Sequence, residues 1–412
     1  MAALPTPGGD VGVWGGELNT FLSVAMNSDG TLKNAYYGSA ILNVKDYGAK
    51  GDGTTDDTTA FRNAVAAVPA NGAVIVVPPG QYKIVGSGGV GFDISGVRVH
   101  FLGAGPRSVN EGLLSGSVIF TPTASLTLVK HVNASIFQNG PVFENITFGE
   151  NVGSGVTLVQ LNNVNTHLFR NCSFIGNTGN SSTVGLSLDG SSDISYGLVD
   201  FCYFRNCQTG FKQASPNVSI TRVNNSYFVS GAGGSAMSNY KLIDATGSGV
   251  AVTNCKFEGN DNTGAIAISV NGLGCRVFGN SFEGCPIGVD GVAQASQKYM
   301  GLIVANNDFT GDAGTETAVR LGANFIGSQV IGNSAIFLSK WVDDADPVGN
   351  QTLVTHRPDF SSDDQYMSLG GVALMAGGAN PPTSAPPNGS TYFGANGLWF
   401  RTGGAWTKVT VP

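Results

Sequence analysis

Two glutamates occupy the same place in a repeated motif, and their spacing suits acid–base chemistry on a sugar chain. Glu258 and Glu283 each directly follow a phenylalanine of the motif. Two carboxyl groups about 5–5.5 Å apart serve as the acid and the nucleophile of retaining glycoside hydrolysis. We therefore predict these two glutamates as the catalytic pair. The positions beside the same phenylalanines also hold four candidates for substrate binding: Tyr203, Arg205, Tyr227 and Lys256.

The binding candidates have types that suit a sugar polymer. Tyrosine rings stack on sugar rings while their hydroxyl groups stay in water. Arginine and lysine suit acidic groups. The alternative interpretation is that these charges only solvate an outward face, as charges do on most protein surfaces. A groove between subunits is a further alternative for the site.

The motif recurs about every 24 to 30 residues, which is the period of a solenoid. Its copies are rich in Gly, Asn and β-branched residues, which excludes helical repeats. The pattern of leucine-rich repeats is also missing. A parallel β-helix with one coil per copy is therefore predicted. The repeated phenylalanines are Phe148, Phe174, Phe204, Phe228, Phe257, Phe282 and Phe309.

Alternation along a strand assigns a direction to each position of the motif. We expect the phenylalanines to point inward, so the residues on either side point outward. The six candidates then lie on one sheet across four consecutive coils. Glu258 and Glu283 come about one coil apart, roughly 4.8 Å. Two places before the phenylalanine, Cys172, Cys202 and Cys255 are predicted as small core residues.

The stretch "NVKDYGAKGDGTTDDTTAFRNAVAAV", residues 43–68, is rich in Asp and Gly but lacks the signature of a ligand loop. A phosphate-binding P-loop would end in Gly-Lys-Ser/Thr. An EF-hand would carry a Glu at its twelfth position. We therefore expect a turn and a helix capped by Asp56 or Asp57. The helix would cover the open end of the solenoid, which is otherwise an exposed sheet edge.

The same stretch, with "VIVVPPGQYKI" after it, resembles the start of the pectate-lyase-like right-handed β-helix proteins, in the form found in bacteriophage tailspikes and some glycanases. The resemblance implies an all-β, right-handed parallel β-helix to about residue 340. It also implies a polysaccharide hydrolase, a lyase or a protein that only binds. The family's Asn-Thr-Asp, Gly-His-Gly, Arg-Ile-Lys and W-I-D-H signatures are absent, so no catalytic residue is carried over.

The N-terminal segment, residues 1–40, contains a short amphipathic helix with Trp14, Leu18 and Phe21 on one face. It resembles the pieces by which phage tail proteins attach to the virion. The alternative is that the helix packs on the end of the solenoid. We expect the β-helix itself over 41–345.

The C-terminal part is expected to divide into a connecting segment with a Pro/Gly/Ser linker, 346–390, and a small β meander, 391–412. The turns of the meander are predicted at Asn396-Gly397 and Gly403-Gly404. About twenty residues cannot form a core alone. This tip is similar to those of phage tail proteins, which implies a homotrimer.

Composition excludes several classes of partner. The net charge is −7 and there is no Lys/Arg-rich run, so nucleic acid is not expected to bind. No apolar run is long enough to span a membrane. The first residues lack the features of a signal peptide, so we expect synthesis in the host cytoplasm and reduced thiols.

No cofactor or zinc site is expected, because the four histidines are scattered. The run "WVDDADP", with Asp343, Asp344 and Asp346, is either a calcium site or a solvated turn.

The sequence therefore predicts a phage tailspike-like virion protein, attached to a tail or baseplate protein through its N-terminus. We expect it to bind a bacterial surface polysaccharide and to cleave it as a glycoside hydrolase. Three alternatives stay open: a polysaccharide lyase, a non-catalytic glycan-binding tail fibre, and a structural virion protein.

Overall fold

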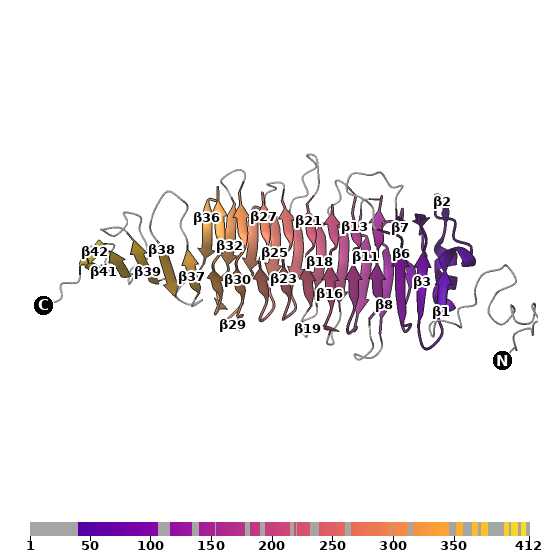
Figure 1. The fold of residues 1–412 in the computed structure, drawn as a ribbon, viewed down its shortest axis with the longest axis horizontal. Coiled ribbons are helices and arrows are strands. Elements are labelled where there is room, and N and C mark those ends of the chain that lie inside the picture. Colours follow the sequence, from indigo (N-terminus) through magenta and orange to yellow (C-terminus); the bar gives the residue numbers. More distant parts are fainter. Residues whose placement is uncertain are drawn as a thin grey trace, which may run out of the picture.

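The repeat of inward phenylalanines builds three parallel sheets in the computed structural model (Figure 1). After the first coil, which carries the helix in place of a third strand, each coil passes from sheet 1 through sheet 2 to sheet 3, and successive coils pair in parallel. The predicted parallel β-helix is confirmed. The structure describes residues 40–105, 116–133, 140–152, 154–177, 182–189, 194–214, 218–219, 221–230, 239–259, 265–296, 298–311, 316–345, 352–356, 365–369, 372–377, 391–394, 397–402 and 405–408.

The three sheets run the length of the solenoid. Sheet 1 begins with β1 (Ala40–Asn43), β3 (Ala73–Val77), β6 (Val99–Gly103), β9 (Val142–Glu144), β12 (Leu168–Arg170), β16 (Leu198–Asp200), β20 (Arg222–Asn224), β23 (Ala251–Thr253), β26 (Arg276–Phe278), β30 (Ile303–Ala305), β34 (Gln329–Ile331) and β37 (Leu353–His356). Sheet 2 consists of β2 (Asp52–Asp56), β4 (Gly80–Lys83), β7 (Ser117–Thr121), β10 (Ile146–Glu150), β13 (Ser173–Ile175), β17 (Tyr203–Arg205), β21 (Tyr227–Val229), β24 (Lys256–Glu258), β27 (Ser281–Glu283), β31 (Asp308–Thr310) and β35 (Ser334–Ile336). Sheet 3 consists of β5 (Val90–Asp93), β8 (Thr127–Val132), β11 (Thr157–Asn162), β14 (Val184–Asp189), β18 (Thr209–Gln213), β22 (Lys241–Ala245), β25 (Ile266–Val270), β28 (Ile287–Gly291), β32 (Thr317–Leu321) and β36 (Lys340–Asp344).

Two further pairs of short strands lie on the turns between sheet 3 and sheet 1. They are β15 (Ile194–Ser195) with β19 (Val218–Ser219), and β29 (Lys298–Tyr299) with β33 (Phe325–Ile326).

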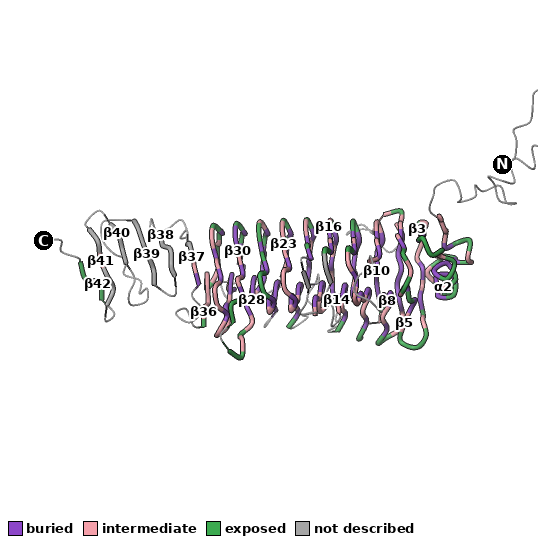
Figure 2. The backbone as a smooth tube through the Cα atoms, turned by 90° about the horizontal axis from the view of Figure 1, so that it is seen from below, coloured by how far each residue is buried: buried purple, intermediate pink, exposed green. Residues whose placement is uncertain are grey.

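The predicted phenylalanine register is confirmed. All seven side chains are at most 2% exposed, and they lie in pairing strands of sheet 2. From Phe174 onward the neighbouring rings stack nearly flat, with centroids 4.5 to 5.0 Å apart. Buried residues line the inside of every coil (Figure 2). This stack aligns the coils, because a slip of one residue would turn every phenylalanine outward.

A second inward row lies two residues before the phenylalanines. Cys172, Cys202 and Cys255 are buried and unbridged, as predicted. Further along, Asn280 donates to Asn307 at 2.9 Å, and Asn307 donates to Asn333 at 2.8 Å. Buried polar groups require such partners. The row therefore continues from small thiols into a satisfied amide ladder.

The helix α2 (Thr58–Ala66) covers the N-terminal end of the solenoid, as predicted (Figure 2). The preceding turn is η2 (Val44–Tyr47). The Oδ1 atom of Asp56 accepts the Thr58 amide at 3.0 Å. Asp57 is buried and accepts the amides of Lys50 and Gly51. The Asp residues of this stretch therefore build the turn and cap the helix, as the sequence indicated.

The C-terminal end of sheet 1 changes from parallel to mostly antiparallel pairing. It continues through β38 (Gln365–Leu369), β39 (Val372–Gly377), β40 (Thr391–Gly394), β41 (Gly397–Thr402) and β42 (Ala405–Lys408). The last three strands form the predicted meander, whose first strand pairs in parallel with β39. The amphipathic helix expected around Trp14 to Ala25 lies outside the described residues. The linker was expected from Ala376 onward, but its first two residues belong to β39, and 378–390 lie outside the described residues. No helix in the described part of the chain has the length and apolar character to cross a bilayer.

We predict that Phe257→Ala lowers the free energy of unfolding by about 3–5 kcal/mol, the usual cost of emptying a large aromatic site in a core. Phe257 is fully buried and stacks on both Phe228 and Phe282. Urea unfolding followed by circular dichroism measures the change. The control is Ser281→Ala at an exposed position of the neighbouring strand, with an expected change within about 0.5 kcal/mol. An equal effect of the two substitutions would contradict the importance of the stack.

Candidate functional site

All six predicted site residues lie on the outer surface of sheet 2, in four consecutive coils. Tyr203 pairs with Tyr227 in the neighbouring strand, and Tyr227 pairs with Lys256. Glu258 pairs with Glu283 one coil further on. We call Tyr203, Arg205, Tyr227, Lys256, Glu258 and Glu283 the candidate face. Their juxtaposition is as the repeat predicted, and their roles stay predictions.

Lys256 lies between the two predicted catalytic carboxylates. Its Nζ atom is 2.8 Å from Glu258 Oε1 and 3.0 Å from Glu283 Oε2. The hydrogen bonds to the two glutamates raise the pKa of Lys256, so the ammonium stays charged. The arrangement follows from the strand register, since parallel pairing sets the two glutamates side by side. One cation therefore neutralises much of the charge of the pair.

The position of Lys256 changes what Glu258 is suited to do. Burial acts to raise the pKa of Glu258, but hydrogen bonds from Lys256 and Tyr227 and the charge of Lys256 outweigh burial and lower it. A general acid must hold a proton near neutral pH. Glu258 is thus unsuited to the acid role and suited to a nucleophile or a base. In a hydrolase, Glu283 would have to supply the proton.

The two tyrosines form the aromatic part of the candidate face. Their ring centroids are 5.5 Å apart with an interplanar angle of 49°. Burial and the carboxylate of Glu258 raise the pKa of Tyr227, which keeps its hydroxyl protonated. Lys256 Nζ lies 5.7 Å from the centroid of the Tyr227 ring, within the range of a cation–π contact. The rings are held by their neighbours and remain partly exposed.

Arg205 differs from Lys256 in its partners. In the part of the chain that the structure describes, Arg205 forms no ion pair with an acid, and its Nε atom is buried without a hydrogen-bond partner. It lies on the same strand as Tyr203 and is partly exposed. A guanidinium group recognises carboxylate and phosphate in a planar, bidentate manner. Arg205 is therefore the cation of this face that is available to an anionic ligand.

The acidic run near residue 343 is only partly described. Asp343 forms an ion pair with Lys340 at 3.0 Å. Asp344 accepts a hydrogen bond from Thr352 at 2.7 Å. Asp346, the third ligand of the calcium alternative, lies outside the described residues. Across the described ranges no group of three or more His, Cys, Asp or Glu side chains comes together as a metal site.

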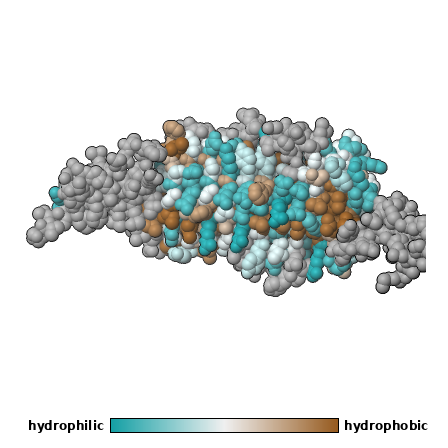
Figure 3. Space-filling view, in the orientation of Figure 1, coloured by the Kyte–Doolittle hydropathy of each residue, from teal (hydrophilic) through white to brown (hydrophobic). Residues whose placement is uncertain are grey.

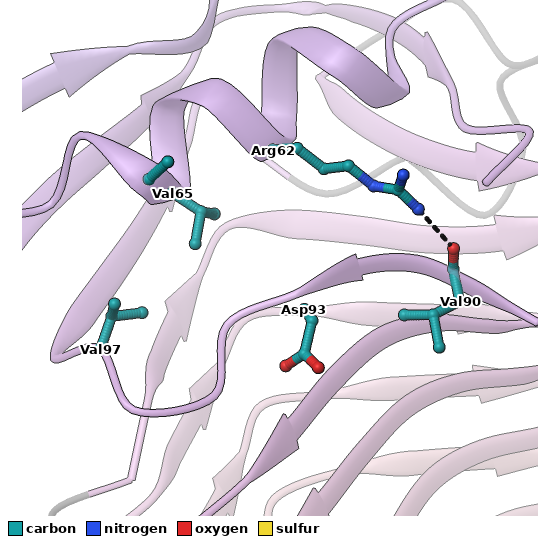
Figure 4. A pocket seen from close by; sticks show the side chains of 6 residues that line it. Arg62, Val65, Val90, Asp93 and Val97 are labelled. Atoms are coloured by element: carbon teal, nitrogen blue, oxygen red, sulfur yellow. Dashed lines mark hydrogen bonds between the residues drawn. The ribbon is translucent and has the colours of Figure 1, made fainter. Parts of the chain in front are cut away.

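A separate hollow of about 350 Å³ lies beside α2, lined by Arg62, Val65, Ala66, Val90, Asp93 and Val97 (Figure 4). Arg62 uses its guanidinium there to bind the carbonyl groups of Val90 and Gly91. This arginine therefore ties the capping helix to the first coil. The hollow therefore lies where the capping helix packs on the solenoid, and it belongs to the cap.

Hydrophilic side chains cover much of the middle of the solenoid, and a hydrophobic patch lies toward its N-terminal end (Figure 3).

Sequence reasoning missed one exposed aromatic residue on the same coil as Tyr203. This residue is Phe201, which is 61% exposed. The available signal was that Phe201 stands where most other motif copies have asparagine.

Comparisons with known sequences and with solved structures both support the fold. The family model "Rhamnogalacturonase A/epimerase, pectate lyase-like" matches residues 41–112. Among curated proteins of Azotobacter vinelandii, alginate lyase 7 is 46% identical over 77 residues, which is 18% of this chain and 9% of the lyase. The mannuronan C5-epimerase AlgE2 is 41% identical over 77 residues, covering 18% of this chain and 8% of the epimerase. The chain thus spans less than a tenth of these relatives.

Solved structures resemble the chain over a much greater length. The Dettilon tailspike protein has a TM-score of 0.50 at 15% identity, covering 87% of this chain and 82% of its own. The ORF18 protein of Geobacillus virus E2 has a TM-score of 0.50 at 15% identity. The match covers 100% of this chain and 91% of the viral protein. The DFA-IIIase of Arthrobacter chlorophenolicus A6 in complex with GF2 has a TM-score of 0.51 at 14% identity. The match covers 74% of this chain and 92% of the DFA-IIIase. These likenesses show the shared β-helix fold, and the resemblance to pectate-lyase-like proteins is confirmed.

Proposed function

We propose that the chain is a tailspike-like virion protein whose candidate face binds an acidic polysaccharide of a bacterial surface. The observation that carries the proposal is the pair of adjacent, mutually tilted tyrosine rings beside an arginine without an acidic partner among the described residues. Likeness in fold to a tailspike protein and to a viral protein supports the same conclusion.

The tyrosines account for binding of a sugar chain. Tyr203 and Tyr227 occupy equivalent positions in neighbouring coils, so their rings recur at the spacing of paired strands. A chain of linked sugar rings offers a repeated apolar face for such a ladder. Both rings keep part of their surface in water, while the hydroxyl group of Tyr227 donates a hydrogen bond to Glu258.

Arg205 accounts for the preference for an acidic polymer. Lys256 is held by two glutamates, so its charge is already matched. Arg205 offers the remaining positive group to a carboxylate on the sugar. The short matches to proteins named alginate lyase and mannuronan epimerase are consistent with a uronate chain.

Cleavage of the bound chain is the second candidate function. It is favoured by the two glutamates in register on adjacent strands, whereas their shared contact with Lys256 opposes the acid role and would have to be broken at Glu283. The arrangement is compatible with roughly the 5–5.5 Å carboxyl separation of a retaining hydrolase. Glu258, kept ionised, would be the nucleophile, and Glu283 the acid. The same face without turnover is a binding site only.

The binding proposal predicts that Arg205→Gln weakens affinity for a uronate polymer roughly 10- to 100-fold, because a hydrogen bond to a charged group is lost. Binding is measured by calorimetry with alginate, polygalacturonate, purified bacterial capsular polysaccharides and neutral dextran. The control variant is Arg222→Gln, an exposed arginine on sheet 1. Equal affinity of the parent for dextran and for the uronate chains would contradict the preference for an acidic polymer.

If the chain cleaves the polysaccharide, Glu258→Gln and Glu283→Gln should each reduce the rate by about 10²–10⁴-fold, the usual contribution of a catalytic acid or base. Binding should persist in both variants. Reducing-end release reports hydrolysis, and absorbance of unsaturated uronate reports a lyase. Activity in either variant within about tenfold of the parent would exclude the pair. Absence of both products from every polymer that binds would leave a binding protein.

We also propose that the chain assembles as a parallel homotrimer through its terminal segments, since closed symmetry would bury their apolar residues. Light scattering should give about three times the chain mass of 42.3 kDa. Removal of residues 376–412 should weaken the assembly. A parent that scatters as a monomer at micromolar concentration, or a truncated chain that trimerises equally well, would contradict this assembly.

A further inference from the structure

Phe201 occupies a backbone position for which phenylalanine is poorly suited. It forms the corner between β16 and β17, with φ of 51°. A left-handed backbone is unfavourable for a bulky side chain and acceptable for glycine and asparagine. The equivalent corners of other coils hold Asn145, Asn171, Asn225, Asn254, Gly279, Asn306 and Gly332.

Phe201 also interrupts a ladder of hydrogen bonds along these corners. Asn171 donates its side-chain amide to Asn145 Oδ1 of the preceding coil at 2.7 Å. Phe201 offers no such group to Asn171. One coil later, Asn225 donates instead to Asp200 Oδ1 at 2.9 Å. An asparagine at this corner would continue the ladder.

The ring of Phe201 gains little from burial in compensation, because the residue is 61% exposed. With phenylalanine at this corner, the backbone is strained and one hydrogen bond of the ladder is missing, and the ring does not fill the core. Strain that is kept at an exposed position indicates a contact outside the folded chain. The neighbourhood of the residue indicates what that contact is.

Phe201 lies on the same stretch as two residues of the candidate face. Cys202 and Phe204 point inward, so Tyr203 and Arg205 alternate with them on the outside, and Phe201 is the exposed corner residue just before this stretch. Phe201 therefore lies at the edge of sheet 2, two residues before Tyr203.

We propose that Phe201 is a sugar-stacking residue that extends the candidate face around the corner between sheet 1 and sheet 2. The proposal rests on the proposed binding of a polysaccharide to that face. Phenylalanine has no polar group, so its contact with a sugar is through the apolar face of the ring. The adjacent Asp200, Asn171 and Asn225 supply hydrogen-bonding groups for the hydroxyls at the edge of the same sugar.

The test replaces Phe201 with the residue that the corner favours. Phe201→Asn should raise the midpoint temperature of unfolding by roughly 2 °C, because the strain is relieved and Asn171 gains a partner. The same variant should bind alginate or polygalacturonate about 3- to 10-fold more weakly, since one aromatic contact is lost. Phe201→Tyr, which keeps the ring, should bind as tightly as the parent.

The matched control is Tyr196→Asn at the other end of β16. Tyr196 is also aromatic and 66% exposed, with φ of 57°. It lies on the corner between sheet 3 and sheet 1, across β16 from the candidate face. We expect this substitution to relieve strain in the same way and to leave affinity for the polymer unchanged.

The outcomes separate the two proposals. Parent-like affinity of Phe201→Asn for a polymer that the parent binds would overturn the role of Phe201 and leave the proposed function standing. A parent that binds no polysaccharide of the panel overturns the proposed function and this inference together. A change in the mass of the assembly in Phe201→Asn would identify Phe201 as a subunit contact, and a lower midpoint temperature would overturn the argument from strain.

Discussion

The stack of phenylalanine rings is the contact on which the rest of the structure depends. From Phe174 to Phe309 each ring lies on the ring of the next coil, with centroids at most 5.0 Å apart. Because side chains alternate along a strand, an inward phenylalanine forces both of its neighbours outward. The stack thus aligns the coils and turns the six residues of the candidate face outward, although other flanking residues, such as Thr147 and Ser173, are buried. The candidate face exists because of this alignment.

Parallel pairing in register then decides the electrostatics of the face. Residues that are 25 positions apart in the chain, such as Glu258 and Glu283, become neighbours. Two carboxylates in that arrangement would repel each other, and Lys256 removes the repulsion by contacting both. The same contact lowers the pKa of Glu258 and so assigns it a different chemical role from the one that two isolated carboxylates suggest. Arg205, with no such partner among the described residues, keeps its charge for a ligand.

Regularity in a solenoid also makes exceptions informative. The corners between sheet 1 and sheet 2 repeat one left-handed residue, and in the other coils from Asn145 to Gly332 this residue is asparagine or glycine. Phe201 departs from the pattern at the coil that also carries Tyr203 and Arg205. A departure that costs the fold and lies beside a cluster of binding residues is more informative about function than the pattern itself.

The sequence alone determined the architecture, because the fold is a repeat. The period of the phenylalanines predicted the coils, and alternation predicted which residues face out, including all six of the candidate face. The Asp-rich start was correctly interpreted as a capped helix, although Asp56, and not Asp57, accepts the Thr58 amide. Only the tertiary structure showed that Lys256 reaches both glutamates while Arg205 is left without an acidic partner among the described residues. Side-chain reach and the sharing of one charge between coils depend on distances across strands, which spacing along the chain does not contain. For the same reason Phe201 was overlooked: its backbone angle and the exposure of its ring appear only when the corner is folded.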